Sequence, residues 1–217
     1  MRQTFHDQIQ ELQQRIIYMG NLVSEMIDQA TLSLARKDSD LARKVIADDD
    51  EIDGLLIEVQ MKSMQLLALQ QPMARDLRRI GTGMKIVTDL ERMADHATDI
   101  AEVTLRLEGE PLIKPLVDIP RMAGLAQQMT RHALDAYVGQ NEKLAREMIA
   151  MDHDVDAIYS RMFDELLGFM ERDPAVVKQA TYLLHVAAYL ERVADHATNI
   201  GEWTIYMLTG VLEELND

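Results

Sequence analysis

The sequence predicts an all-α fold, arranged as two tandem, pseudo-symmetric three-helix bundles of six long helices. Three observations support this prediction. Strong helix formers such as Ala, Leu, Met, Glu and Gln dominate the chain, and only 5% of its residues are aromatic. No stretch alternates apolar and polar residues in the manner of a half-buried strand. The two halves of the chain also share an internal repeat, so one helical unit is expected to occur twice.

The five prolines mark where the predicted helices begin and end, because proline interrupts the backbone hydrogen bonds of a helix interior. Helices are therefore expected at residues 5–35, 39–70, 75–108, 121–139, 142–171 and 175–209. Asp38 or Ser39 is expected to cap the second helix and Asn141 the fifth, and Asp173 with Pro174 begins the sixth. The predicted domains are a first bundle at residues 1–110, a linker at 111–120 and a second bundle at 121–217.

Two segments of the first half return in the second. Residues 90–102 read LERMADHATDIAE and residues 190–202 read LERVADHATNIGE, with ten identities in thirteen positions. Residues 41–53, LARKVIADDDEID, match residues 144–156, LAREMIAMDHDVD, at seven of thirteen positions. Each half therefore carries one three-helix unit, and two copies are too few for a solenoid.

Geometry brings four acidic residues of each half to one height. A short connection makes neighbouring helices antiparallel, and residues four apart share one helix face. Residues 53 and 91 lie equally far from Pro72, as do residues 49 and 95, and the second hairpin has the same symmetry about residues 173 and 174. The sequence thus predicts two acidic sites, the first formed by Asp49, Asp53, Glu91 and Asp95 and the second by Asp152, Asp156, Glu191 and Asp195.

A bound cation is the simplest account of these sites. A single pair of acids on a helix is usually solvated surface, but here four pairs share repeat-related positions, and gathered carboxylates resist ionising together. Arg92 and Arg192 point about 100° away and are too few to compensate. Oxygen ligands suit Mg, Ca, Mn and Fe, with Zn also possible. His96 and His196 follow the motif Asp and are expected to support the ligands as neighbours.

Composition limits the function in other ways. The net charge of −15 disfavours nucleic-acid partners, which are bound through clustered Lys and Arg. The chain has no Cys, which excludes disulfides and thiolate chemistry. The start MRQTFHDQIQ lacks the features of a signal peptide, and no apolar run is long enough to span a bilayer. A cytoplasmic protein without direct membrane insertion is expected.

The paired motifs resemble the signature of the PhoU family, accessory regulators of phosphate transport. The resemblance covers essentially the whole chain, from ELQQRIIYMGNLV through KDSDLARKVIADDDEID and QPMARDLRRI to the second motif. It implies multinuclear metal sites of iron or zinc on the same eight acids, and a negative regulator of phosphate uptake and phosphate-starvation signalling. The implied partners are the ATPase of the phosphate-specific ABC transporter, a phosphate-sensing histidine kinase and a second copy in a homodimer. Asp99 aligns with Asn199, which argues against assuming equal metal loading of the two halves.

Two other classes of function remain open from the sequence. A carboxylate-bridged, metal-dependent hydrolase or oxidase is disfavoured, because none of the six histidines has an acid three residues before it, as ferritin-like di-iron sites require. There is also no Gly-rich phosphate loop and no nucleophile elbow. The third hypothesis is a structural helical adaptor with empty acidic grooves. The sequence favours a regulator that is not an enzyme.

Overall fold

The computed structural model describes residues 2–215, and side chains from residue 5 onward. Its helices are α1 (Arg2–Arg36), α2 (Ser39–Gln70), α3 (Arg75–Arg106), α4 (Asp118–Gly139), α5 (Glu142–Arg172) and α6 (Val177–Thr209), with a short 3₁₀ helix η1 (Pro174–Val176). The predicted all-α class and the six long helices are confirmed.

The helices begin and end close to the predicted prolines and capping residues, with differences at the starts of α4 and α6. Two predicted caps form through backbone amides that donate to side chains: Leu41 N to Asp38 (3.0 Å) and Leu144 N to Asn141 (3.2 Å). Asp173 accepts from Ala175 N at 2.9 Å and caps the 3₁₀ helix η1 instead, so α6 begins at Val177, two residues later than predicted. Helix α4, however, begins at Asp118, three residues earlier than predicted. Pro120 lies inside its first turn, where a missing amide proton costs no helical hydrogen bond.

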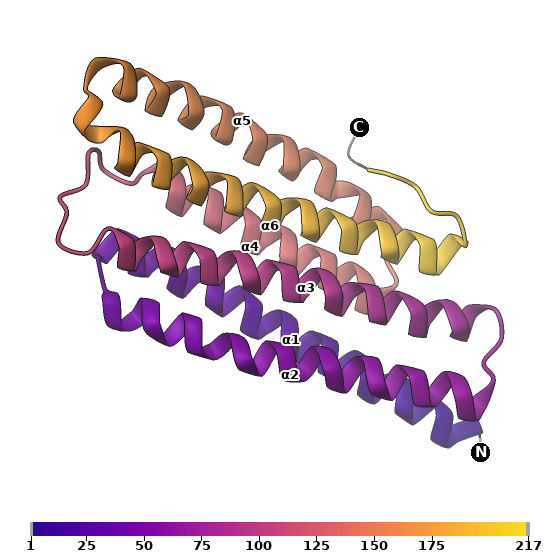
Figure 1. Cartoon of the computed structure of the whole chain (residues 1–217). Coiled ribbons are helices and arrows are strands. Elements are labelled where there is room, and N and C mark those ends of the chain that lie inside the picture. The colour runs from indigo at the N-terminus through magenta and orange to yellow at the C-terminus, as the bar shows by residue number, and fades with distance from the viewer. Residues whose placement is uncertain (1, 216–217) are drawn as a thin grey trace.

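The two repeats are joined through four central helices. Helices α3 and α6 lie side by side and run antiparallel at the centre of the molecule, and α1 contacts α4 beside them (Figure 1). Helices α2 and α5 lie at the outer edges, where each completes a hairpin with its neighbour. The pseudo-symmetry expected from the sequence therefore relates two hairpins, α2–α3 and α5–α6, on opposite sides of a shared seam.

One continuous hydrophobic core runs through both repeats. The repeated motif contributes small residues to it, since Ala94, Ala97, Ala194 and Ala197 are fully buried. These apolar positions anchor the motif in the core and leave its acidic residues facing their own hairpin. The predicted division of the chain at the 111–120 linker stays a prediction.

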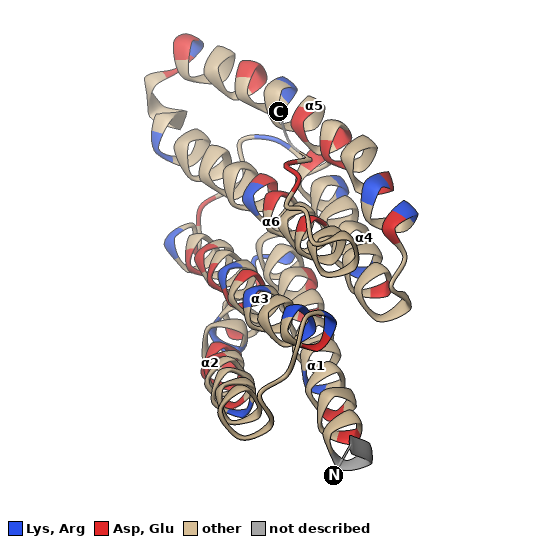
Figure 2. Ribbon diagram, turned by 90° about the vertical axis from the view of Figure 1, so that its right-hand side faces the viewer, with Lys and Arg blue, Asp and Glu red and all other residues tan. Residues whose placement is uncertain are grey.

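None of the described helices combines the length with the apolar character that crossing a membrane requires. Acidic and basic residues are interspersed along the helices, but the end of α2 that leads into α3 is largely free of both (Figure 2).

Candidate metal centre

The first acidic set forms in the α2–α3 hairpin. Asp49 is partly buried, and its pKa is raised by this burial and by the nearby charges of Asp95 and Asp53. The pKa of Glu91 is raised by burial as well, then by Asp95, while Asp53 and Asp49 add to the effect. The charges of Asp53 and Asp95 therefore lie close enough to oppose the ionisation of Asp49 and Glu91, as the spacing around Pro72 predicts.

The second set forms at the repeat-related place in the α5–α6 hairpin. Asp152 is only 5% exposed, and burial, followed by the charges of Asp156 and Asp195, raises its pKa to about 6. Burial and the neighbouring acids also raise the pKa of Glu191 and of Asp195. The structure thus brings together all four predicted residues of this set, and this set is the more strongly perturbed of the two.

The two sets differ in their nearest cation. In the first set the Arg92 guanidinium donates to Asp95 at 2.9 Å and lies 3.4 Å from Glu91, although the helical wheel directs it away from them. The side chain reaches across because its long stem is flexible. Arg192 makes no ion pair within the described residues, so the second set lacks the direct neutralisation that Arg92 gives the first.

The donor chemistry fits a hard or borderline cation, but the side chains do not form a finished ligand cage. Within residues 5–215 no three carboxylate or imidazole groups converge on a point that one ion would occupy. The buried Thr98 hydroxyl lies beside the Asp49 carboxylate and favours its ionised form, which offsets part of the rise in the pKa of Asp49. Crowded, partly buried carboxylates fit a site that gains stability when a cation binds.

The histidines of the motif lie in the seam between α3 and α6. The His96 ring stacks on Tyr189, with centroids 5.6 Å apart, and lies 5.9 Å from the His196 ring. His196 Nδ1 is 3.0 Å from Asp89 Oδ1. Asp89 and Tyr189 occupy repeat-related positions. Each histidine therefore contacts the equivalent position of the opposite helix, which is an aromatic ring for His96 and a carboxylate for His196. These contacts are with residues outside the two acidic sets, so the predicted role of the histidines as neighbours that support the ligands stays a prediction.

Sequence reasoning missed Asp89 and Tyr189 because it compared positions for identity. The signal in the sequence was the difference between the halves at two positions: 89/189, just before the motif, and 99/199, within it. Asp99 lies 3.5 Å from His96, and the Asn199 amide donates to Asp89 at 3.4 Å. The difference between Asp99 and Asn199 therefore has a structural role in the seam.

Two further motif acids, at repeat-related positions, lie apart from the sets. Glu102 pairs with Arg106 at 2.7 Å. Glu202 accepts a hydrogen bond from the Leu215 amide at 2.6 Å, which ties the C-terminal segment to α6. Their existing partners explain why these two positions are conserved between the halves without any metal.

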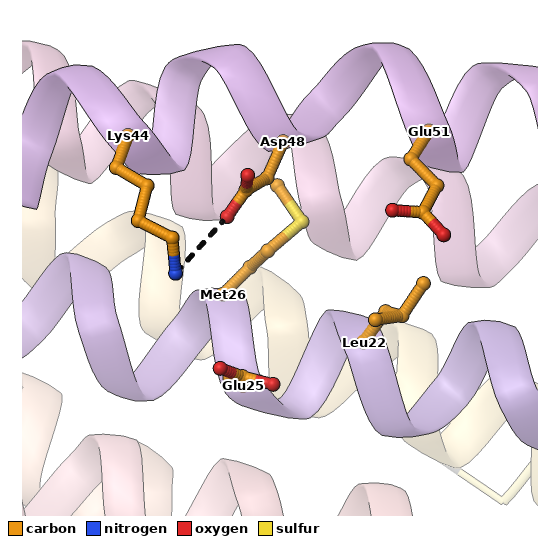
Figure 3. A pocket seen from close by; sticks show the side chains of 6 residues that line it. All are labelled: Leu22, Glu25, Met26, Lys44, Asp48 and Glu51. Atoms are coloured by element: carbon orange, nitrogen blue, oxygen red, sulfur yellow. Dashed lines mark ion pairs between the residues drawn. The ribbon is translucent and has the colours of Figure 1, made fainter.

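A separate acidic cavity of about 160 Å³ lies between α1 and α2 (Figure 3). Its carboxylates already have partners, since Asp48 pairs with Lys44 at 3.7 Å, Glu51 accepts from Tyr18 at 2.8 Å and Glu25 accepts from Gln29 at 2.6 Å. Asp48 and Glu51 lie on the α1 side of α2 and provide a matched control for substitutions in the metal sets.

The raised pKa of Asp152 predicts how the stability of chelator-treated protein depends on pH. Its folded pKa of about 6 lies above the ordinary 3.8, so the folded state binds this proton more tightly than the unfolded state does. The resulting stabilisation is complete below about pH 4 and is lost as pH rises through about 6. We expect Asp152→Asn to shrink the difference in melting temperature between pH 5 and pH 7.5. An unchanged difference would contradict the raised pKa.

Fold and site together define a class: a duplicated three-helix protein that holds one set of crowded carboxylates in each repeat. The model of the PhoU domain matches residues 16–104 and 119–204, and the chain belongs to the PhoU family. A phosphate-specific transport system accessory protein PhoU homolog of Clostridium acetobutylicum is 42% identical over 100% of this chain and 99% of its own length. A homolog of Thermotoga maritima is 35% identical over 97% of this chain and 89% of its own length.

Solved structures agree with this assignment. PhoU from Pseudomonas aeruginosa superposes with a TM-score of 0.91 at 31% identity, covering 95% of this chain and all of that one. The phosphate transport system regulatory protein PhoU from Streptococcus pneumoniae gives a TM-score of 0.90 at 31% identity, covering 96% and 99%. The predicted family and the two-repeat helical bundle are confirmed, and the family indicates a role in the regulation of phosphate transport.

Proposed function

We propose that the chain is a metal-binding negative regulator of phosphate uptake and of phosphate-starvation signalling. The names of its relatives support the link to phosphate-specific transport. The observation that carries the metal part is the crowding of four carboxylates in each repeat, with the pKa of Asp152 raised to about 6. Such crowding costs stability unless positive charge compensates for it.

The metal would be held by the two predicted sets: Asp49, Asp53, Glu91 and Asp95, then Asp152, Asp156, Glu191 and Asp195. Carboxylates can bridge neighbouring ions, so a multinuclear site in each hairpin is proposed. Iron or zinc is our first choice, and Mg, Mn or Ca would suit the same oxygen donors. A bound ion would cross-link α2 to α3 and α5 to α6, and would replace repulsion within each hairpin by attraction.

The proposed partners are the ATPase of the phosphate-specific ABC transporter, a phosphate-sensing histidine kinase and a second copy of the chain. This places the protein in the cytoplasm, without membrane insertion and without nucleic acid. We propose no catalysis. Each histidine of the seam meets an aromatic ring or a carboxylate of the opposite helix, so neither is positioned in a hairpin groove as an acid or base.

A complementation experiment tests this function. In cells that lack the protein we expect phosphate-uptake genes to be expressed even at high phosphate, and we expect the parent chain to restore repression. A variant with Glu91→Ala, Asp95→Ala, Glu191→Ala and Asp195→Ala should fail to restore it, whereas Asp48→Asn/Glu51→Gln should succeed. Normal repression without the protein would contradict the regulatory role. Full complementation by the four-residue variant would contradict the need for metal.

A further inference from the structure

The outward face of α2 carries an exposed apolar ridge. Ile57, Met61, Gln65 and Leu69 recur every four residues, and Met73 continues the spacing into the α2–α3 connection. The side chains of Ile57, Met61, Leu69 and Met73 are 61%, 58%, 78% and 81% exposed, and Met64 beside them is 56% exposed. We call residues 57, 61, 65, 69 and 73 the α2 ridge. Apolar exposure on this scale along one line is unusual for a surface helix.

No described helix covers the α2 ridge. Helix α2 contacts only α1 and α3 among the described elements, and its outer face lies at the edge of the molecule (Figures 1 and 2). The two charged residues of this part of α2 turn toward α1, where Glu58 pairs with Arg15 at 3.0 Å and Lys62 pairs with Glu11. The ridge is therefore left without charge on a chain whose net charge is −15.

The second repeat shows that the fold itself does not require this ridge. The positions of α5 that correspond to residues 57, 61, 65 and 69 are Ser160, Asp164, Gly168 and Arg172. They occupy an equivalent outer helix with equivalent neighbours, α4 and α6. The two outer helices therefore differ along this line, since α5 is polar there and α2 is apolar.

The pattern of the ridge is symmetric about Gln65. Met61 and Leu69 lie four residues to either side, and Ile57 and Met73 lie eight residues to either side. Two antiparallel copies centred on Gln65 would match Met61 with Leu69 along α2, and Met73 lies past the left-handed Gln71 that ends the helix. Ridges formed by every fourth residue interlock in the most common helix-packing class, which crosses at about −50°. A surface that complements itself in this way suits a twofold dimer.

We propose that a second copy of this chain docks on the α2 ridge and forms a twofold dimer with the axis beside Gln65. The charge distribution favours this location. Two copies with the same net charge repel one another, and this repulsion is smallest where the contacting surfaces carry no charge, as on the ridge. A standard interface buries about 800 Å² per partner, and the large side chains of Ile57, Met61, Met64 and Leu69, all more than half exposed, would contribute to such an interface. The inference deepens the homodimer of the proposed function, but it depends on neither metal nor phosphate.

Sedimentation of the full chain, treated with chelator, tests the dimer apart from the regulatory role. The parent is expected to sediment as a dimer. Met61→Asp should weaken dimerisation by about a hundredfold or more, since the symmetric contact buries two unpaired carboxylates. Ser160→Asp adds the same charge to the polar ridge of α5 and should leave the dimer unchanged. A monomeric parent, or a dimer that Met61→Asp does not weaken, overturns the proposal.

Cross-linking tests the axis. The chain contains no Cys, so a single introduced thiol reports on one position. Gln65→Cys should form a disulfide-linked dimer on mild oxidation, because residues at the axis of two packed helices come within disulfide reach. Asp164→Cys, equally exposed on α5, should stay monomeric on a denaturing gel. Equal cross-linking of both variants, or cross-linking of Asp164→Cys alone, overturns the proposed axis.

Discussion

Adding metal to chelator-treated protein is expected to raise its melting temperature by roughly 5–10 °C for each of the two sets that binds. A ligand present at 100 times its Kd stabilises the folded state by about 2.7 kcal/mol per site. For a domain of this size each kcal/mol moves the melting temperature by about 2–4 °C. The physical source of the gain is the relief of repulsion among carboxylates such as Asp152 and Glu191, whose pKa values are raised by burial and by their neighbours.

The double variant Asp152→Asn/Glu191→Gln should change how the melting temperature responds to metal at the second set. Without metal it is expected to melt above the parent, because it keeps the shape of the side chains and removes the repulsion. With metal it should gain less than the parent, since only the first set can bind. Differential scanning calorimetry of both proteins, with chelator and with metal, measures all four values. A variant that melts below the parent in chelator would show that the carboxylates do not repel one another.

The second large effect is expected at the seam, where Asp89→Ala should lower the free energy of unfolding by about 1–3 kcal/mol. Asp89 is only 9% exposed and lies 3.0 Å from His196 Nδ1, and it accepts from the Asn199 amide. Truncation would leave both partners partly buried without this carboxylate. The control Asp154→Ala removes an exposed acid of α5 and should change stability by less than about 0.5 kcal/mol. Urea denaturation of the chelated proteins gives both values, and equal effects would contradict the role of Asp89.

The features that could be predicted from the sequence are those that depend on residues of a single repeat. Helix boundaries followed from prolines and caps such as Asp38 and Asn141, because these act over a few residues. The two acidic sets followed from equal distances to Pro72 and to the midpoint of residues 173 and 174, because a short connection fixes the register of a hairpin. These predictions needed only helical periodicity and the geometry of a turn.

The packing of one repeat against the other could not be predicted from the sequence in this way. Periodicity shows that one face of α3 is buried, but it does not show that α6 covers it, since many pairings of six amphipathic helices satisfy the same pattern. For this reason the contacts of His96 with Tyr189 and of His196 with Asp89 emerged only from the structure. Arg92 was misjudged for another reason: the wheel gives the direction of a Cβ, and a long side chain can still return to Asp95.

The most direct test of the central claim is elemental analysis of untagged protein that has been purified without chelator. We predict near-stoichiometric metal in the parent and in Asp48→Asn/Glu51→Gln, whose substituted acids already have partners. The variant with Glu91, Asp95, Glu191 and Asp195 all changed to Ala should be folded and should contain no metal. A metal-free parent that also fails to bind added iron, zinc, manganese, magnesium or calcium would contradict the claim, as would full metal content in the folded four-residue variant.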